Sequence, residues 1–244
     1  MQYKGKTVII TGGASGMGLL CGKNFYQEGA NVVLVDVNKQ ALEEINKEMP
    51  NALCLTADIT EFEQVKYTVD TAMEKFKSVD VMINMAGGSS CRMRQSFGEF
   101  CDRDIKDIKW GMDINLMAPI YYCHEVMRIM RAQKSGVIIN IGSIKGVEGD
   151  PAGSDYTISK SAVMTGLTES MAILGAPYGV RCCCVSPGPV MTRPGMGGMK
   201  TLIGRQGQPQ EVVDLIMYLC SDKAGFINGC NYMIDGGRSC VRGY

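Results

Sequence analysis

The chain has 244 residues, of which 45% are hydrophobic, and its 25 lysine and arginine residues balance 25 aspartate and glutamate residues. A chain of this length can bury one α/β core without a second domain, and a net charge of zero excludes strong attraction to nucleic acid or an anionic membrane. No apolar run approaches the roughly 20 residues of a membrane span, and the first strand starts too early for a signal peptide, so we expect a cytoplasmic protein.

Short apolar runs alternate with longer stretches of helical spacing. The runs that predict strands begin at Val8 and Val32 and continue at Val79–Ile83, Val137–Ile141, Val180–Val185 and Tyr232–Ile234. The stretches that predict helices follow Gly16, Lys39, Glu61, Asp102, Ser154 and Gln210. The alternation predicts a single α/β domain, residues 1–244, built on a doubly wound parallel sheet.

A glycine-rich segment follows the first apolar run directly. It reads Thr11-Gly12-Gly13-Ala14-Ser15-Gly16-Met17-Gly18 and is followed by helical sequence. The order of strand, glycine-rich turn and helix is typical of dinucleotide sites, because glycine permits a tight turn and a close approach of pyrophosphate to the backbone. The first N–H groups of the helix would then bind the phosphates.

Asp36 ends the second apolar run and lies eighteen residues after Gly18. A carboxylate in this position can accept hydrogen bonds from both ribose hydroxyls of an adenosine and would repel a 2′-phosphate. The neighbours Ser15 and Val37 carry no charge that would attract that phosphate, so the pattern predicts NAD rather than NADP. The alternative is that Asp36 caps the helix expected to begin near Asn38.

Tyr156 and Lys160 are four residues apart in a stretch with helical character. Side chains at this spacing share one face of a helix, so both can act on one substrate atom. A nearby ammonium favours the phenolate and lowers the pKa of a tyrosine from its usual value of about 10. Such a pair can move a proton to or from an alcohol.

These motifs resemble the classical short-chain dehydrogenase/reductase (SDR) family, and the resemblance extends over essentially the whole chain. It implies a Rossmann-type NAD-binding oxidoreductase domain. Asp58 and Ile59 are similar to the family residues beside the adenine, and Asn84-Met85-Ala86-Gly87 is similar to its Asn-Asn-Ala-Gly element. Met85 departs from the second asparagine of that element, which predicts a weaker hydrogen bond across the central sheet.

The resemblance also implies the rest of the site. Asn115 matches an asparagine that interrupts a long helix and holds a water molecule linking the lysine to solvent, and Ser143 lies thirteen residues before Tyr156, the family spacing for a serine that binds the substrate oxygen. Pro187-Gly188 with Val190 and Thr192 resembles the turn that packs on the nicotinamide. The expected cofactor-binding residues are Gly12, Ser15, Gly16, Met17, Gly18, Asp36, Asp58, Ile59, Asn84, Ala86, Gly87, Tyr156, Lys160, Pro187, Gly188, Val190 and Thr192.

The resemblance implies reversible hydride transfer between a secondary alcohol and the nicotinamide of NAD. The expected catalytic residues are Asn115, Ser143, Tyr156 and Lys160: Tyr156 takes the hydroxyl proton and Lys160 stabilises the tyrosinate. A catalytically silent, NAD-binding regulatory member of the family is an alternative. An enoyl reductase is disfavoured, because its usual Tyr/Lys spacing is longer.

The substrate is expected to meet Ser143, Tyr156, Lys145 and Gly88, and its identity stays open among polyols, steroids, hydroxy acids and hydroxyacyl thioesters. Lys145, with the nearby arginines 92 and 94, can bind an anionic substrate or extend into water. The segment around residues 190–204 includes the glycine- and methionine-rich stretch 194–199 and is expected to be a short substrate lid, with a simple surface loop as the alternative.

The sequence also bears on the assembly, the state of the cysteines and metal binding. Family members commonly form tetramers through two long helices and the last strand, so the resemblance implies a homotetramer through residues 113–132 and 154–175. Eleven cysteines include no Cys-x-x-Cys pair, and Cys182-Cys183-Cys184 falls inside a predicted buried strand, so free thiols are expected. The single histidine, His124, cannot form a histidine-based metal site alone, and no metal is expected.

Overall fold

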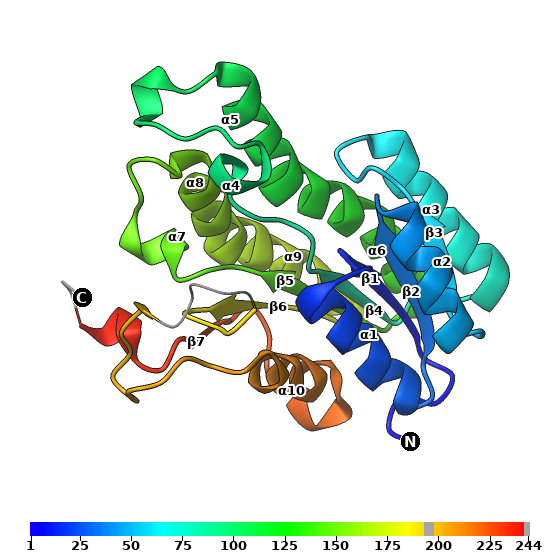
Figure 1. The fold of residues 1–244 in the computed structure, drawn as a ribbon. Coiled ribbons are helices and arrows are strands. Elements are labelled where there is room, and N and C mark those ends of the chain that lie inside the picture. Colours follow the sequence, from blue (N-terminus) through cyan, green and yellow to red (C-terminus); the bar gives the residue numbers. More distant parts are fainter. Residues whose placement is uncertain (193–197, 242–244) are drawn as a thin grey trace.

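A computed structural model of the protein describes residues 1–192 and 198–241. Its centre is one parallel sheet of seven strands in the order β3-β2-β1-β4-β5-β6-β7 (Figure 1). The strands are β1 (Thr7–Thr11), β2 (Asn31–Asp36), β3 (Leu53–Thr56), β4 (Val81–Asn84), β5 (Gly136–Ile141), β6 (Val180–Pro187) and β7 (Asn231–Ile234). The chain runs outward from β1 to β3 and then returns to β4 beside β1, which places a topological switch point between β1 and β4.

Helices cover both faces of the sheet. One face packs against α1 (Gly16–Gln27), α2 (Lys39–Glu48) and α10 (Pro209–Cys220), and the other packs against α3 (Phe62–Phe76), α6 (Ala118–Gln133) and α9 (Thr168–Gly175). Because both faces are buried, the central strands are continuously apolar rather than alternating. In β1, for example, Val8 and Ile10 belong to one core cluster and Ile9 to the other. The predicted doubly wound α/β architecture is confirmed.

The six predicted strands are present, and β3 was not predicted. It has four residues, lies at one edge of the sheet, and only Leu55 among them is buried. The apolar run Leu53-Cys54-Leu55 is too short to stand out from its surroundings as a strand. Two short helices, α4 (Ser90–Met93) and α7 (Lys145–Glu148), also went unpredicted, since a single turn leaves no periodic pattern.

Two long helical segments are each interrupted by a π-helical turn. The first runs from α5 (Ile105–Met112) through the π turn η2 (Asp113–Met117) into α6. The second runs from α8 (Ser154–Ala162) through the π turn η3 (Val163–Leu167) into α9. Asn115 lies in the first turn, at the helix interruption that the resemblance implies. π turns occur frequently at functional sites, because they widen the helix locally.

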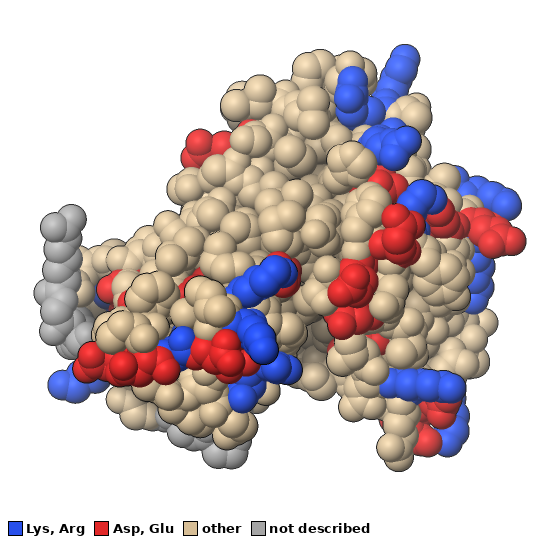
Figure 2. All heavy atoms as spheres, turned by 90° about the horizontal axis from the view of Figure 1, so that it is seen from above, with Lys and Arg blue, Asp and Glu red and all other residues tan. Residues whose placement is uncertain are grey.

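The cysteines are free thiols, as predicted, and Cys182, Cys183 and Cys184 are completely buried in β6. Burial raises the pKa of Cys184 to about 11, so this thiol stays protonated at neutral pH. Within the described ranges, none of the helices combines the length and the apolar character needed to cross a membrane. Figure 2 shows basic and acidic side chains side by side on one face, which also has a broad uncharged area.

Candidate active site at the carboxyl edge of the sheet

The predicted site residues converge on one edge of the sheet. The glycine-rich turn follows β1, Asp36 ends β2, residues 84–88 end and follow β4, Ser143 follows β5, and Pro187 ends β6. Parallel strands present their carboxyl ends at the same edge, and ligands of open α/β sheets bind there, at the switch point. The topology therefore brings together segments that are far apart in the sequence.

The turn after β1 can be built only with glycines at two of its positions. A Cβ on Gly18 would lie 2.1 Å from the Gly12 carbonyl oxygen, and Gly12 itself has a φ of +66°. At Gly16, φ is +52° and no atom lies within 4 Å of the position a Cβ would take. The turn thus leaves open space at the first residue of α1, and this arrangement fits a dinucleotide pyrophosphate.

The Asp36 carboxylate binds the backbone of both the glycine-rich turn and the residue that precedes α2. Its Oδ2 accepts a hydrogen bond from the Ala14 N–H at 3.1 Å, and its Oδ1 accepts one from the Asn38 N–H at 3.0 Å. The side-chain cap of α2 is Asn38, whose Oδ1 accepts from the Ala41 N–H. The capping alternative for Asp36 is therefore excluded for its side chain, and the carboxylate stays beside the expected ribose position.

The segment after β3 has the two residues expected beside the adenine. Asp58 Oδ1 accepts hydrogen bonds from the N–H and the hydroxyl of Thr60, at 3.0 and 2.7 Å. Ile59 is buried, with 5% of its surface exposed, and belongs to the core cluster on the α3 side of the sheet. Its burial limits any contact with an adenine ring to the exposed margin of the side chain.

The Asn84 side chain joins two strands rather than facing the cofactor position. Its Nδ2 donates to Asn140 Oδ1 at 2.8 Å, which joins β4 to β5 inside the core. Thr11 Oγ1 accepts from the backbone N–H groups of both Met85 and Ala86, at 3.0 Å each, and so joins the end of β1 to the same turn. Backbone donors therefore hold the sheet together at Met85, whose side chain is not needed for this bond.

Lys160 brings the predicted catalytic residues together. It is 3% exposed, and its Nζ donates to the Ile141 carbonyl at the end of β5, at 2.7 Å. The same Nζ lies 5.7 Å from the centre of the Tyr156 ring. A Cβ on Gly87 would meet Lys160 Nζ at 3.4 Å and Asn115 Oδ1 at 2.5 Å, so only glycine lets the turn after β4 approach both side chains.

Asn115 holds that turn in place. It is completely buried, and its Oδ1 accepts from the Gly88 N–H while its Nδ2 donates to the Gly88 carbonyl, both at 2.9 Å. The Nδ2 also donates to the Gly111 carbonyl one turn earlier. Both amide protons are thus committed to the backbone, and this pattern needs an amide rather than a carboxylate or a hydroxyl.

Burial lowers the pKa of Lys160 to about 8, because an ammonium loses its hydration in the interior. The lysine thus titrates close to neutral pH. A group of this kind can carry a positive charge beside Tyr156 and can also exchange a proton near physiological pH.

Ser143 and Tyr156 lie on the two segments that follow β5. Ser143 is 8% exposed, and its Oγ accepts from the Lys145 N–H at 3.2 Å, which fixes the first turn after the strand. Tyr156 is half-buried in the first turn of α8, one helical turn before Lys160. Both side chains therefore belong to the same edge of the sheet as the glycine-rich turn.

Two of the three cations that the sequence places near the substrate are paired with carboxylates. Lys145 Nζ lies 3.4 Å from Asp150 and 3.9 Å from Glu148. Arg94 Nε lies 3.1 Å from Asp107. These ion pairs neutralise the charge that an anionic substrate would need, and they favour the solvated alternative over an anion site.

The turn after β6 contains the remaining expected cofactor residues. A Cβ on Gly188 would lie 2.5 Å from the Asp235 side chain, so this turn packs closely against the chain beyond β7. Val190 is buried and pairs with Gly207 in an isolated parallel bridge, while Thr192 is exposed. Residues 193–197 of the expected lid lie outside the described residues.

Thr11 and Asn140 were missed by sequence reasoning, although both organise the site. Asn140 joins Asn84 to Thr168, because its Nδ2 donates to the Thr168 hydroxyl next to the π turn η3. Both are polar residues inside otherwise apolar strands, and this pattern could have marked them. The sequence does not show, however, which strand lies beside each of them.

Comparisons with known proteins agree with this geometry. A family model described as short chain dehydrogenase matches residues 6–198. A 3beta-hydroxysteroid dehydrogenase 2 from Eggerthella lenta is 34% identical over 255 aligned residues, covering 96% of this chain and 95% of that protein. A cyclopentanol dehydrogenase from Comamonas sp. is 32% identical, with coverages of 95% and 96%. The crystal structure of NAD⁺-bound xylitol dehydrogenase matches with a TM-score of 0.88 at 27% identity, covering 97% of this chain and 100% of that chain.

The buried lysine predicts a pH-dependent stability. In the unfolded chain Lys160 should have a pKa of about 10.4, so between its folded pKa of about 8 and that value the unfolded state binds more protons. The unfolding free energy of the cofactor-free protein, relative to Lys160→Met, should therefore rise by about 3 kcal/mol from pH 7 to pH 11. Denaturant unfolding of both proteins at several pH values measures this, and parallel curves would show that the ammonium is not desolvated.

Proposed function

Because the chain belongs to the short-chain dehydrogenase family, we propose that it is an NAD-dependent oxidoreductase that interconverts a secondary alcohol and a ketone. One observation carries the proposal. The buried ammonium of Lys160 lies beside the Tyr156 ring, with Gly87 and Asn115 packed against it, at the edge of the sheet that also presents the glycine-rich turn. The proposed proton carrier and the proposed dinucleotide site thus share one edge of the sheet.

The residues divide the chemistry between them. Bound NAD would supply the hydride acceptor. Tyr156 takes the proton of the substrate hydroxyl as the hydride leaves the carbon, and returns it when a ketone is reduced. Lys160 stabilises the tyrosinate by its charge, and Ser143 holds the substrate oxygen by a hydrogen bond. Asn115 keeps the turn after β4 against Lys160, so that the ammonium stays shielded from bulk water.

NAD is proposed over NADP on the basis of Asp36. Its carboxylate accepts from the backbone of the glycine-rich turn, and this fixes a negative charge at the end of β2 where a 2′-phosphate would lie. The NAD⁺-bound state of the xylitol dehydrogenase structure supports the same choice. The residues proposed to hold the cofactor are those expected from the sequence, with Asn84 acting through its backbone, since its side chain is used between β4 and β5.

A neutral substrate is proposed, because two of the three nearby cations are already paired with carboxylates. Lys145 interacts with Asp150 and Glu148, and Arg94 interacts with Asp107. An anionic hydroxy acid would have to displace these carboxylates. Relatives whose names specify a hydroxysteroid or cyclopentanol support cyclic, uncharged alcohols as the first compounds to test.

The function is tested by NADH formation with purified protein, NAD or NADP, and a panel of alcohols. The panel contains cyclopentanol, a 3β-hydroxysteroid, xylitol, an anionic hydroxy acid and a hydroxyacyl thioester. We expect turnover with NAD on a neutral alcohol and little on the anionic compounds. NADH binding without turnover on any compound would instead support the non-catalytic alternative.

Tyr156→Phe should lower kcat at least about 100-fold, because it removes the proton carrier and leaves the dinucleotide site unchanged. The NADH dissociation constant, measured by fluorescence, should stay within twofold. Tyr178→Phe is the matched control, since it also removes one hydroxyl, which accepts a hydrogen bond from Arg131 away from the site. Retained turnover in Tyr156→Phe would exclude the proposed mechanism.

Replacing Asp36 should weaken the discrimination against NADP at least tenfold, measured as the ratio of kcat/KM for the two cofactors. Asp36→Ala removes both the charge and the acceptor for the Ala14 N–H, whereas Asp36→Asn keeps an acceptor oxygen and removes only the charge. Equal effects of the two variants would assign the discrimination to the charge. An unchanged cofactor ratio in both would remove the proposed role of this carboxylate.

A homotetramer is proposed as the assembly. β7 is the last strand at one edge of the described sheet, and α6 and α9 both lie on the same face of the sheet. Phe226, five residues before β7 in the chain, is completely exposed, as a residue covered in an assembly would be in a single subunit. Light scattering in solution should give four times the subunit mass of 26.5 kDa, and a monomeric mass would contradict the proposal.

A further inference from the structure

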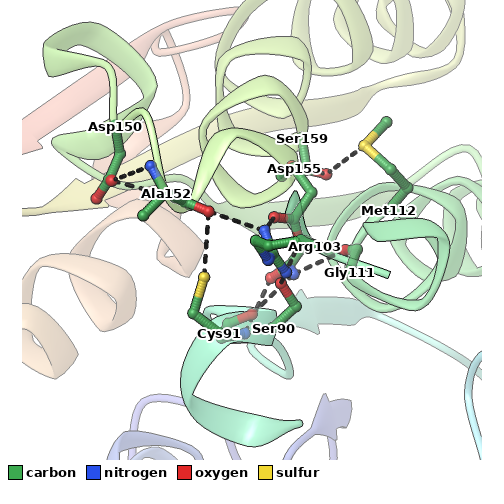
Figure 3. A network of polar contacts seen from close by, with 12 residues as sticks. Ser90, Cys91, Arg103, Gly111, Met112, Asp150, Ala152, Asp155 and Ser159 are labelled. Carbon is green, nitrogen blue, oxygen red and sulfur yellow. Dashed lines mark hydrogen bonds and ion pairs between the residues drawn. The ribbon is translucent and has the colours of Figure 1, made fainter. Parts of the chain in front are cut away.

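A buried ion pair adjoins the proposed proton carrier. Asp155 immediately precedes Tyr156 in α8, and Arg103 comes from the segment between β4 and α5. The distance between Arg103 Nη1 and Asp155 Oδ1 is 2.7 Å, and both side chains are completely shielded from solvent. Figure 3 shows Arg103 between the short helix α4 and the first turn of α8.

Ser90 closes the network. Its hydroxyl donates to Asp155 Oδ2 at 2.5 Å and accepts from Arg103 Nη2 at 2.6 Å (Figure 3). Arg103 Nη1 also donates to the Ala152 carbonyl, in the loop that leads into α8. The guanidinium thus binds both the loop and the first turn of the helix that carries Tyr156.

The backbone is shaped to admit this carboxylate. A Cβ on Gly111 in α5 would lie 1.8 Å from Asp155 Oδ2, so any larger residue there would displace the side chain. One turn after Asp155, the Ser159 hydroxyl donates to the Asp155 carbonyl at 2.7 Å and contacts the Met112 sulfur. Three segments distant in sequence therefore meet at one carboxylate.

The loop before α8 is also held by Asp150 Oδ1, which accepts from the Ala152 and Gly153 N–H groups, but α8 itself starts without a side-chain cap. Its N-cap is Gly153, which makes no side-chain capping hydrogen bond. Asp155 lies in the first turn of α8, where the helix dipole also favours a carboxylate. Because its side chain is completely buried, the carboxylate needs a partner for its charge, and the Arg103 guanidinium is that partner. A buried ion pair adds little net stability, because the cost of desolvating both charges offsets their attraction. A positional role therefore accounts better for this pair's place beside Tyr156.

We propose that Arg103 and Asp155 are positioning residues that hold Tyr156 in place for proton transfer. The proposal rests on the function proposed above. The pair fixes the first turn of α8 to the segment after β4, and Asn115 fixes Gly88 of that same segment beside Lys160. The Tyr156 phenol and the Lys160 ammonium are thereby both held against the segment between β4 and α5. Breaking the Arg103–Asp155 contact lets the two groups move apart and leaves the glycine-rich turn after β1 unchanged.

Two variants break the support in different ways. Arg103→Met/Asp155→Leu removes both charges together, so neither is left buried and unpaired, and stability is largely preserved. Gly111→Ala keeps every charge and displaces the Asp155 carboxylate by its added methyl group. The matched controls are Gly166→Ala, where no atom lies within 4 Å of the new Cβ, and Arg181→Met, which breaks a guanidinium network on the Leu219 and Ser221 carbonyls.

The kinetic measurement uses the panel alcohol that the wild-type protein oxidises fastest. We expect kcat to fall at least tenfold in both test variants, with the NADH dissociation constant within twofold and a larger solvent deuterium isotope effect, since proton transfer becomes limiting. When assayed well below their melting temperatures, both controls should have the same kcat as the wild-type protein. If kcat instead follows thermal stability across all four proteins, or stays within twofold in both test variants, the positional role is excluded.

A second measurement does not depend on turnover. Hydrogen exchange of the amides in residues 152–158 should be at least tenfold faster in both test variants than in the wild-type protein, and unchanged in the controls. Unchanged exchange would overturn the proposed anchoring. If the wild-type protein oxidised no alcohol, the proposed function would fail, while the exchange rates would still decide whether Arg103 and Asp155 hold the turn that carries Tyr156.

Discussion

The burial of one ammonium group is the constraint on which the rest of the site depends. Lys160 lies in the interior with its Nζ on the carbonyl that ends β5, where a charge loses most of its hydration. Its approach to the turn after β4 requires a residue without a side chain, and Gly87 meets that requirement with a φ of +144°. The position of the lysine thus follows jointly from a strand end, a helix and a glycine.

Hydrogen bonds between strand ends give this edge of the sheet its rigidity. Thr11 joins β1 to the turn after β4, Asn84 and Asn140 join β4 to β5, and Asn115 clamps Gly88 from the π turn η2. Each of these polar side chains is buried and paired, so each stabilises one arrangement of backbone and disfavours others. Lys160, which is bonded to the end of β5, is thus attached to an edge that these bonds hold in place.

Charges around the substrate side are balanced locally. Lys145 and Arg94 are matched by carboxylates at the surface, and Arg103 is matched by Asp155 in the interior. The surface pairs leave these cations already neutralised by carboxylates, whereas the interior pair holds the first turn of the helix that carries Tyr156. An ion pair at the surface thus only neutralises a cation, whereas the buried ion pair also fixes the position of a helix.

The sequence by itself determined the α/β alternation, the glycine-rich turn and the Tyr156/Lys160 pair, because periodicity, backbone freedom and helical spacing are local properties of a chain. It did not reveal β3, whose apolar run is too short, or the side chain that caps α2. Only the tertiary structure decided that Asn84 meets Asn140 in the neighbouring strand and that Arg103 meets an aspartate 52 residues away. Such partners are selected by how the elements pack, and no local pattern in the sequence encodes which distant segment will lie beside a given side chain.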